Sequence, residues 1–136
     1  MCSCRVGRQG YLATVTSEEE NRFLVAALGG PDAVDMCWLG GYQDTLDPSY
    51  SEPSGGWKWI TGEPWLCTNW LPGEPNDSWG FGTENCLEYY YHSAGWNDKV
   101  HDMLWELNGY VVEYAPEPTS ALLLAVGSLV VRRGRR

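Results

Sequence analysis

Hydrophobic residues near the N-terminus recur at the spacing of an α-helix. The apolar stripe spans residues 23–28 and follows a polar, acidic stretch. Ser17 and Glu20, three residues apart, have the pattern of an N-terminal capping box. Glycines and a proline at 29–31 then interrupt the stripe. Together these signals predict a helix that opens at Thr16 or Ser17 and ends at the glycines.

The rest of the chain alternates short apolar runs with long polar stretches rich in Gly, Pro, Asn and Asp, as in a loop-rich sheet protein. The strands predicted from these runs cover residues 11–15, 37–42, 57–61, 84–91 and 110–114. The interval at residues 62–83 is unusually long for a loop in a compact domain, which favours a functional loop or one ordered by a ligand.

The character of the sequence changes after residue 114. Pro116-Glu117-Pro118 cannot continue a strand, residues 121–131 are almost wholly apolar, and arginines dominate residues 132–136. We therefore divide the chain into a domain at 1–115 and a tail at 116–136. The apolar stretch is shorter than the roughly 20 residues of a spanning helix, and its arginines would face the cytoplasm.

Composition and charge narrow the function classes. The 136 residues are 43% hydrophobic, enough for one domain with a real core, so a disordered chain is not expected. A net charge of -9 argues against nucleic acid as a partner. Five cysteines without paired C-x-x-C spacing argue against a structural zinc site. The N-terminus has no apolar run long enough for a signal peptide, so the protein is cytosolic or its beginning is missing.

Seven short motifs occur in an order that characterises a known family. They are Gly10–Ser17, Trp38-Leu39-Gly40, Trp57-Lys58-Trp59, Asn69-Trp70, Glu74-Pro75-Asn76, Glu84-Asn85-Cys86 and Trp96-Asn97-Asp98. In order and spacing they resemble the C-type lectin-like domain over residues 4–114. The resemblance implies an α+β fold with short helices on small antiparallel sheets and a long calcium-binding loop region. It also implies N-terminal truncation, because the family's first strand and most of its first helix should precede Gly10.

The resemblance implies a calcium site built from two separated loops. Its oxygen ligands would be Glu74, Asn76, Glu84, Asn97 and Asp98, with a formal charge of -3. Calcium takes about six to eight oxygen ligands, so coordination places remain for sugar hydroxyls. The bond before Pro75 is expected to be cis, because a cis X-Pro bond is accessible and turns the neighbouring side chains toward one point.

Sugar binding would use Glu74, Asn76, Glu84 and Asn97, because an amide can coordinate through oxygen while its nitrogen donates to a hydroxyl. In the family, Glu-Pro-Asn goes with mannose, glucose, fucose or N-acetylglucosamine, and Gln-Pro-Asp goes with galactose. However, Trp79 lies in an insert at 78–82 that resembles the aromatic, glycine-rich insert of galactose binders, where a ring packs on the sugar.

A second calcium, which members of the family can hold nearby, would use Asp44 or Asp47, with Asp77 and Glu84. Aspartate is also abundant in ordinary turns, so these residues have a purely structural explanation too. Trp38, Trp57, Trp59, Trp70 and Trp96 are expected in the core and loop packing. His92 and His101, isolated from each other, are expected to be polar surface residues.

The two disulfides of the family are not expected. Cys4 and Cys86 match one half of each bridge, but Val112 and His101 stand near the positions of their partners. Cys67 could pair with Cys86 or Cys37, and the sequence does not decide between them. Without the bridges, the ligand loops would depend more on a bound ion for order.

The tail resembles the PEP-CTERM sorting signal through Pro116–Ser120, the apolar stretch and the arginines at 132–136. The resemblance implies a bacterium with an outer envelope, export, transient anchoring at the inner membrane, processing by an exosortase, and display at the surface or in the matrix. Since such a protein must cross a membrane, the absent signal peptide then indicates a start upstream of this sequence.

These expectations favour calcium-dependent carbohydrate binding, of the mannose, glucose or fucose type. The alternative is an adhesion module that uses calcium for structure and binds a protein. An enzyme is disfavoured because no Ser/His/Asp or Cys/His set appears and the paired carboxylates are accounted for as metal ligands.

Overall fold

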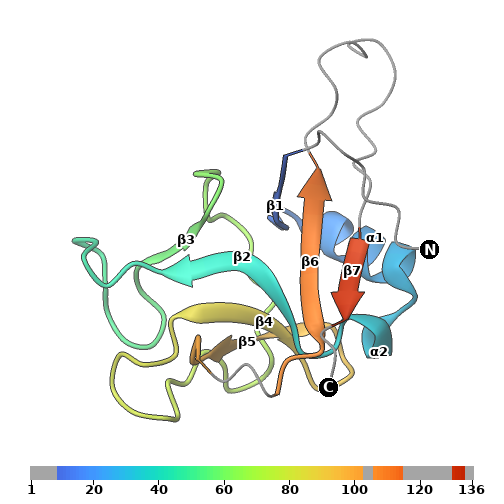
Figure 1. Ribbon diagram of the computed structural model, residues 1–136. Helices are drawn as coiled ribbons and strands as arrows, with labels where there is room; N and C mark the ends of the chain where they lie inside the picture. Colours follow the sequence, from blue (N-terminus) through green and yellow to red (C-terminus); the bar gives the residue numbers. More distant parts are fainter. Residues whose placement is uncertain (1–8, 103–105, 115–129, 134–136) are drawn as a thin grey trace.

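A computed structural model describes residues 9–102, 106–114 and 130–133 (Figure 1). The helices are α1 (Glu18–Leu28) and α2 (Pro31–Val34). The strands are β1 (Gly10–Leu12), β2 (Cys37–Gln43), β3 (Trp57–Trp59), β4 (Cys86–Tyr90), β5 (Gly95–Lys99), β6 (Gly109–Tyr114) and β7 (Val130–Arg133). Short helices beside a sheet make this an α+β fold, as the sequence predicts.

The strands form one mixed sheet rather than the small antiparallel sheets that were expected. Its order is β1-β6-β2-β4-β5, with β3 paired to β2 and β7 paired to β6. Strands β2 and β6 are parallel, whereas the other pairs are antiparallel. The parallel pair was not expected: β2 and β6 are far apart in sequence, and a long connection allows a parallel pair that no hairpin could make.

Helix α1 begins as the capping pattern predicts. Ser17 Oγ accepts a hydrogen bond of 3.1 Å from the backbone N–H of Glu20. The Glu20 carboxylate accepts from the backbone N–H of Thr16 at 2.7 Å, one residue earlier than in a capping box. Gly29 ends the helix with a left-handed φ of 109°. Pro31 then starts α2, which the sequence did not predict because Gly-Gly-Pro was interpreted only as a stop signal.

Strand β5 was not predicted either. It pairs with β4 over five positions, from Tyr90↔Gly95 to Cys86↔Lys99. All of its residues are buried, including Asn97, Asp98 and Lys99. A strand covered on both faces lacks the alternation of polar and apolar residues that identifies a half-buried strand. The five-residue extent of β4 lies within the predicted 84–91.

Five indole rings form the centre of the core. The rings belong to Trp57, Trp59, Trp65, Trp70 and Trp96, with centroid separations from 4.5 to 6.3 Å. Trp59 and Trp96 are almost fully buried, as expected from the sequence. Trp65 and Trp70 come from the long loop, so this segment is held by aromatic packing onto the sheet.

Hydrogen bonds also attach the long loop to β5. Trp96 donates its backbone N–H to Asn69 O at 2.8 Å and accepts from Leu71 N at 2.9 Å. Gly95 lets the loop approach closely, because a Cβ there would lie 2.4 Å from the Leu71 side chain. Residues 69–71, in the middle of the 62–83 loop, are therefore fixed to the strand that carries Asp98.

The tail contributes a strand to the sheet. β7 pairs antiparallel with β6, from Gly109↔Arg133 to Val112↔Val130 (Figure 1). Residues 130–133 were predicted to belong to a separate tail, and their pairing with β6 was not predicted. The other residues of the tail lie outside the described residues, and so do Cys2 and Cys4 near the N-terminus. Across the described ranges, no helix combines the length and apolarity needed to cross a membrane.

Asn21 connects the helix layer to the sheet. Its buried Oδ1 accepts from the Tyr89 hydroxyl at 2.7 Å and from Trp96 Nε1 at 3.3 Å. The two donors come from β4 and β5, so one side chain fixes α1 over the hairpin.

We expect Asn21→Ala to lower the free energy of unfolding by about 2 to 4 kcal/mol, because it leaves two buried donors without an acceptor. Urea unfolding followed by tryptophan fluorescence measures the change. Arg22→Ala, at the exposed neighbouring position, is the control and should change stability by less than about 0.5 kcal/mol. Equal stability of the two variants would contradict this role of Asn21.

Candidate functional site

Three carboxylates from separate segments meet beside β5. Glu74 lies in the long loop, Glu84 lies two residues before the start of β4, and Asp98 belongs to β5. We call these three residues the acidic cluster. The Asp98 carboxylate, almost fully buried, accepts from the backbone N–H of Asn76 at 3.0 and 3.1 Å and of Asp77 at 2.7 Å. The strand thus holds the Glu-Pro-Asn loop in place.

Glu84 fixes the next part of the loop. Its carboxylate accepts from the Ser78 hydroxyl at 3.1 Å and from the Ser78 backbone N–H. Burial, followed by the negative charge of Asp98, raises the pKa of Glu84. The buried Asp98 carboxylate is therefore close enough to disfavour the charged form of Glu84.

Glu74 has the most unusual environment of the three. The Glu74–Pro75 peptide bond is cis, in agreement with the sequence prediction. Burial, then a hydrogen bond and charge repulsion from Asp98, raise the pKa of Glu74 to about 7. Its Oε2 is buried without a hydrogen-bond partner among the described residues. A buried carboxylate oxygen without a donor is costly unless a cation approaches it.

The acidic cluster has the chemistry of a site for a divalent cation. Among the described residues, no ion pair involves Glu74, Glu84 or Asp98. Carboxylate and amide oxygens are the ligands that calcium prefers. In the part of the chain that the structure covers, no three acidic, histidine or cysteine side chains already surround one metal position. Calcium binding would therefore require the carboxylates to turn toward a common point.

Asn97 does not join the cluster in this structure. Neighbouring strand residues project to opposite faces, so Asn97 and Asp98 lie on different sides of β5. The Asn97 amide nitrogen donates to Glu88 Oε1 at 3.0 Å, directly across the β4–β5 pair. Burial raises the pKa of Glu88 to about 7. The role of Asn97 as a calcium and sugar ligand stays a prediction.

The residues proposed for a second calcium are engaged elsewhere. The Lys58 ammonium lies 2.8 Å from Asp44 and 2.5 Å from Asp47. Hydrogen bonds from Lys58 lower the pKa of both aspartates. Because Lys58 already supplies a positive charge there, the contacts favour a structural ion pair at this position. A second calcium stays a prediction.

Asp77 closes the loop that carries Trp79. Its carboxylate accepts from the backbone N–H groups of Gly82 at 2.5 Å, Thr83 at 3.0 Å and Glu84 at 3.1 Å. Burial alone would raise the pKa of Asp77, but these donors lower it overall. This closure was not predicted from the sequence, where its visible signal was Asp77 ahead of Gly80 and Gly82.

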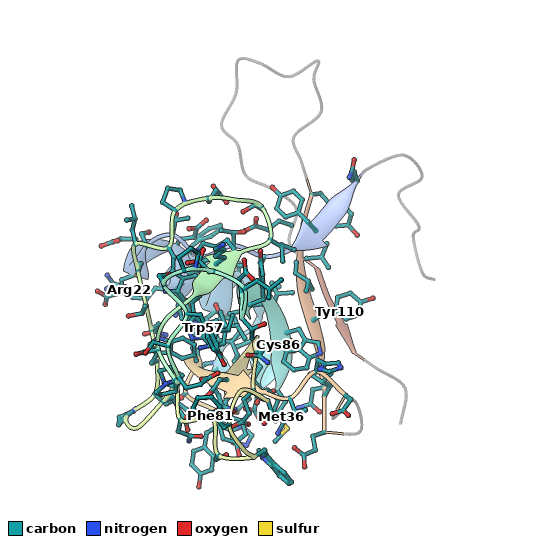
Figure 2. All side chains as sticks on the ribbon, turned by 90° about the vertical axis from the view of Figure 1, so that its left-hand side faces the viewer. Arg22, Met36, Trp57, Phe81, Cys86 and Tyr110 are labelled. Carbon is teal, nitrogen blue, oxygen red and sulfur yellow. The ribbon has the colours of Figure 1, made fainter. Side chains whose placement is uncertain are left out.

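Two aromatic side chains project from the closed loop. Trp79 is 61% exposed and Phe81 is 86% exposed. Phe81 lies at the lower end of the molecule in Figure 2. Trp79 was predicted from the sequence to contact sugar, whereas Phe81 lay in the same predicted insert without a role of its own. Its flanking glycines, Gly80 and Gly82, could have indicated an exposed tip.

The cysteines near the site do not form the bridges that were considered. Cys67 and Cys86 are both free thiols. Cys67 therefore pairs with neither Cys86 nor Cys37. The loop region is held by indole packing and carboxylate hydrogen bonds, not by a disulfide between these residues.

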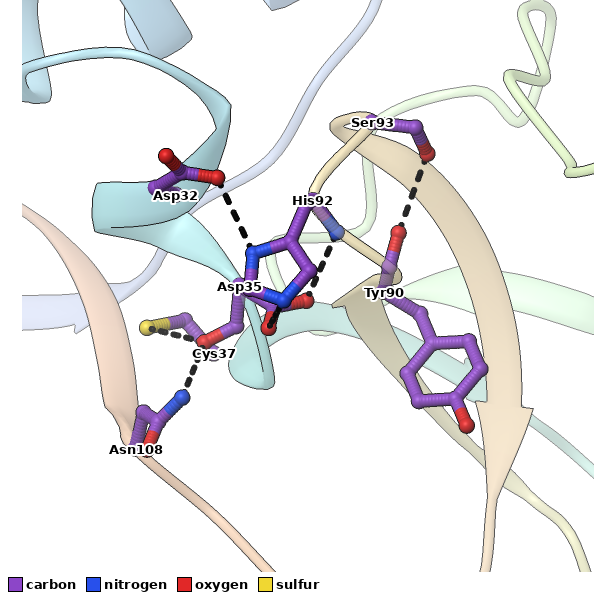
Figure 3. A network of polar contacts seen from close by, with 7 residues as sticks. All are labelled: Asp32, Asp35, Cys37, Tyr90, His92, Ser93 and Asn108. Carbon is purple, nitrogen blue, oxygen red and sulfur yellow. Dashed lines mark hydrogen bonds and ion pairs between the residues drawn. The ribbon is translucent and has the colours of Figure 1, made fainter.

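His92 lies on the surface, as expected, but it has partners. Its Nδ1 is 2.9 Å from Asp32 and its Nε2 is 3.5 Å from Asp35 (Figure 3). The His92 backbone N–H donates to Asp35 at 3.1 Å. These contacts fasten the β4–β5 turn to the end of α2. Their role is to position the hairpin that carries Asp98.

The fold and the loop motifs match a known family. The Lectin C-type domain profile matches residues 1–103, and the chain belongs to this family. The C-type lectin domain family 10 member A of Homo sapiens is 32% identical over 99 residues, which cover 68% of this chain and 27% of that protein. Pulmonary surfactant-associated protein D of Sus scrofa is 48% identical over 92 residues, covering 67% of this chain and 22% of that protein.

A solved structure supports the fold. The human scavenger receptor C-type lectin carbohydrate-recognition domain has a TM-score of 0.50 at 24% identity, covering 67% of this chain and 64% of that one. At this identity the likeness concerns the fold. The chain spans only about a quarter of the two curated relatives named above.

We expect the calcium-free protein, measured in the presence of a chelator, to lose stability as the pH rises from about 4.5 to 7. The folded state holds the Glu74 proton more tightly than the unfolded chain, so ionisation through this window favours unfolding. Glu88 and Glu113, whose pKa values burial raises to about 7, add to the same trend.

Glu74→Gln removes one of these charges and should make the stability curve flatter, with a gain of about 1 kcal/mol at pH 8 in chelator. Thermal unfolding from pH 4 to 8 measures it, and Glu19→Gln on the exposed face of α1 is the control. An unchanged slope in Glu74→Gln would show that Glu74 is not repelled by its neighbours.

Proposed function

We propose that this protein binds carbohydrate in a calcium-dependent manner at the acidic cluster. The observation that carries the proposal is the buried Glu74 Oε2, which has no hydrogen-bond partner in the described part of the chain and lies beside two further acids. Membership of the C-type lectin domain family, whose members generally bind calcium, supports the same interpretation.

The ligands would be Glu74, Asn76, Glu84 and Asp98, with Asn97 as the predicted fifth. A bound calcium ion would supply the positive charge that these carboxylates lack and coordination places for two neighbouring sugar hydroxyls. The protein's own part is to accept hydrogen bonds from those hydroxyls through the glutamates and to donate through the Asn76 amide.

The preferred sugars are of the mannose, glucose or fucose type. Support comes from Glu74-Pro75-Asn76, the loop that the C-type lectin family associates with these sugars. The galactose-type alternative rests on Trp79 and is addressed by the same binding experiment. The second candidate function is a calcium-stabilised adhesion module for a protein ligand, favoured by the exposed rings of Trp79 and Phe81.

We expect calcium to raise the melting temperature in a saturable way, because binding to the folded state stabilises it. Methyl α-mannoside should bind only with calcium, and EDTA should abolish the signal. Glu74→Gln should weaken mannoside binding at least about tenfold, because it removes a ligand charge and a hydroxyl acceptor. Titration calorimetry at fixed pH measures the affinities for calcium and for methyl α-mannoside.

Glu63→Gln, in the long loop but outside the acidic cluster, is the matched control and should bind as the wild type does. Methyl galactoside in place of methyl mannoside tests the sugar preference. Capture of a protein ligand without any saccharide binding would replace the carbohydrate proposal with the adhesion module. A melting temperature that does not change with calcium would contradict the proposed calcium site.

We further propose that the protein is exported and sorted to the cell surface or matrix through the tail at 116–136. The support is the sequence Pro-Glu-Pro, the apolar stretch and the terminal arginines. Anchoring at the inner membrane and cleavage by an exosortase would require residues 130–133 to leave β6, since β7 pairs there.

Expression in an exosortase-containing bacterium should give a cleaved, cell-surface product with the tail and an uncleaved one without it. The comparison uses the chain behind an export signal, with residues 116–136 present or deleted, followed by fractionation and mass spectrometry of the C-terminus. An intact tail on the exported protein would contradict the sorting proposal.

A further inference from the structure

The loop from Asp77 to Glu84 presents two aromatic rings to solvent. Phe81 is 86% exposed and Trp79 is 61% exposed. Phenylalanine carries no polar atom, so its exposure leaves apolar surface in water without any compensating hydrogen bond. We call residues 77–84 the aromatic loop.

Hydrogen bonds within the aromatic loop hold the backbone in this shape. The Asp77 carboxylate accepts from three backbone N–H groups. Thr83 donates its backbone N–H to Gly80 O at 3.1 Å and its hydroxyl to the same oxygen at 2.8 Å. Asn85 Nδ2 donates to Gly82 O at 2.8 Å. The backbone order therefore does not depend on burial of either ring.

The aromatic loop starts inside the candidate site. Glu84 of the acidic cluster accepts hydrogen bonds from the backbone N–H groups of Ser78 and Trp79. A sugar held at the acidic cluster would therefore have the tip of the loop beside it. In Figure 1 the loop leads into β4 on the left of the molecule, whereas α1 lies on the right.

A sugar ring held at the acidic cluster can pack its C–H face on one aromatic side chain, the role predicted for Trp79, and the more exposed Phe81 is then left for a second ring. The acidic cluster and Asn76 bind hydroxyls, which uses the polar edge of one ring. Phe81 offers only an apolar surface, and the C–H face of a second sugar ring is the part of an oligosaccharide that packs on an aromatic ring. An exposed aromatic pair on a fixed backbone beside a polar site is typical of an extended binding surface.

We propose that Phe81 binds the second ring of an oligosaccharide whose first ring is held at the acidic cluster. The inference rests on the proposed carbohydrate binding and adds a preference for chain length. The acidic cluster then selects the terminal sugar, and Phe81 favours ligands of at least two rings over a monosaccharide.

The test compares methyl α-mannoside with α-linked mannobiose by calorimetry in calcium. We expect the wild type to bind mannobiose about five- to tenfold more tightly, and Phe81→Ala to reduce that preference below about twofold. The affinity of Phe81→Ala for methyl α-mannoside should stay unchanged, which also shows that the variant is folded. Phe81→Trp should keep the preference.

Phe23→Ala is the matched control, because Phe23 is the other phenylalanine of the chain and is 54% exposed on α1. It should behave as the wild type. A preference for mannobiose that is equal in wild type and Phe81→Ala overturns the inference and leaves the proposed function intact. Equal weakening of both ligands by Phe81→Ala also overturns it. Absence of any saccharide binding by the wild type overturns the proposed function and this inference together.

Discussion

The packing of Trp96 determines how the other parts of this protein fit together. Its indole contacts the rings of Trp59, Trp65 and Trp70, and its Nε1 donates to Asn21 on α1. Its backbone N–H and C=O bind the long loop at 2.8 and 2.9 Å. One buried residue therefore connects the sheet, the helix and the loop, with both polar backbone groups and the ring nitrogen satisfied.

The side chains of β5 alternate between its two faces, and this alternation determines where the acidic cluster forms. Trp96 points into the aromatic core, Asn97 binds Glu88 on the opposite face, and Asp98 reaches the loop that holds Asn76. Since neighbouring strand residues differ by half a turn, the position of Trp96 fixes where Asp98 lies. The acidic cluster is thus built on a rigid strand, while its other members come from loops that the strand organises.

The polar contacts of the loops divide into two kinds. Asp44 and Asp47 form ion pairs with Lys58, and Asp77 accepts hydrogen bonds from backbone N–H groups. These contacts shape the loops. Glu74 instead has a buried oxygen without a partner in the described residues and a pKa raised to about 7. Residues that are satisfied stabilise the fold, whereas an unsatisfied acid beside other acids marks the candidate site at which we propose that a cation binds.

The sequence by itself determined the capped helix, most of the strands, four of the five core tryptophans (Trp65 was not predicted) and the residues of the loop motifs, because each depends on local spacing or on a short pattern. It did not determine β5, whose buried polar residues break the strand pattern, or the parallel pairing of β2 with β6, which depends on segments far apart in the chain. Only the tertiary structure decided that Asp98 joins Glu74 and Glu84 while Asn97 turns to Glu88. Burial and neighbouring charges act through space, and the order of residues along the chain does not encode them directly.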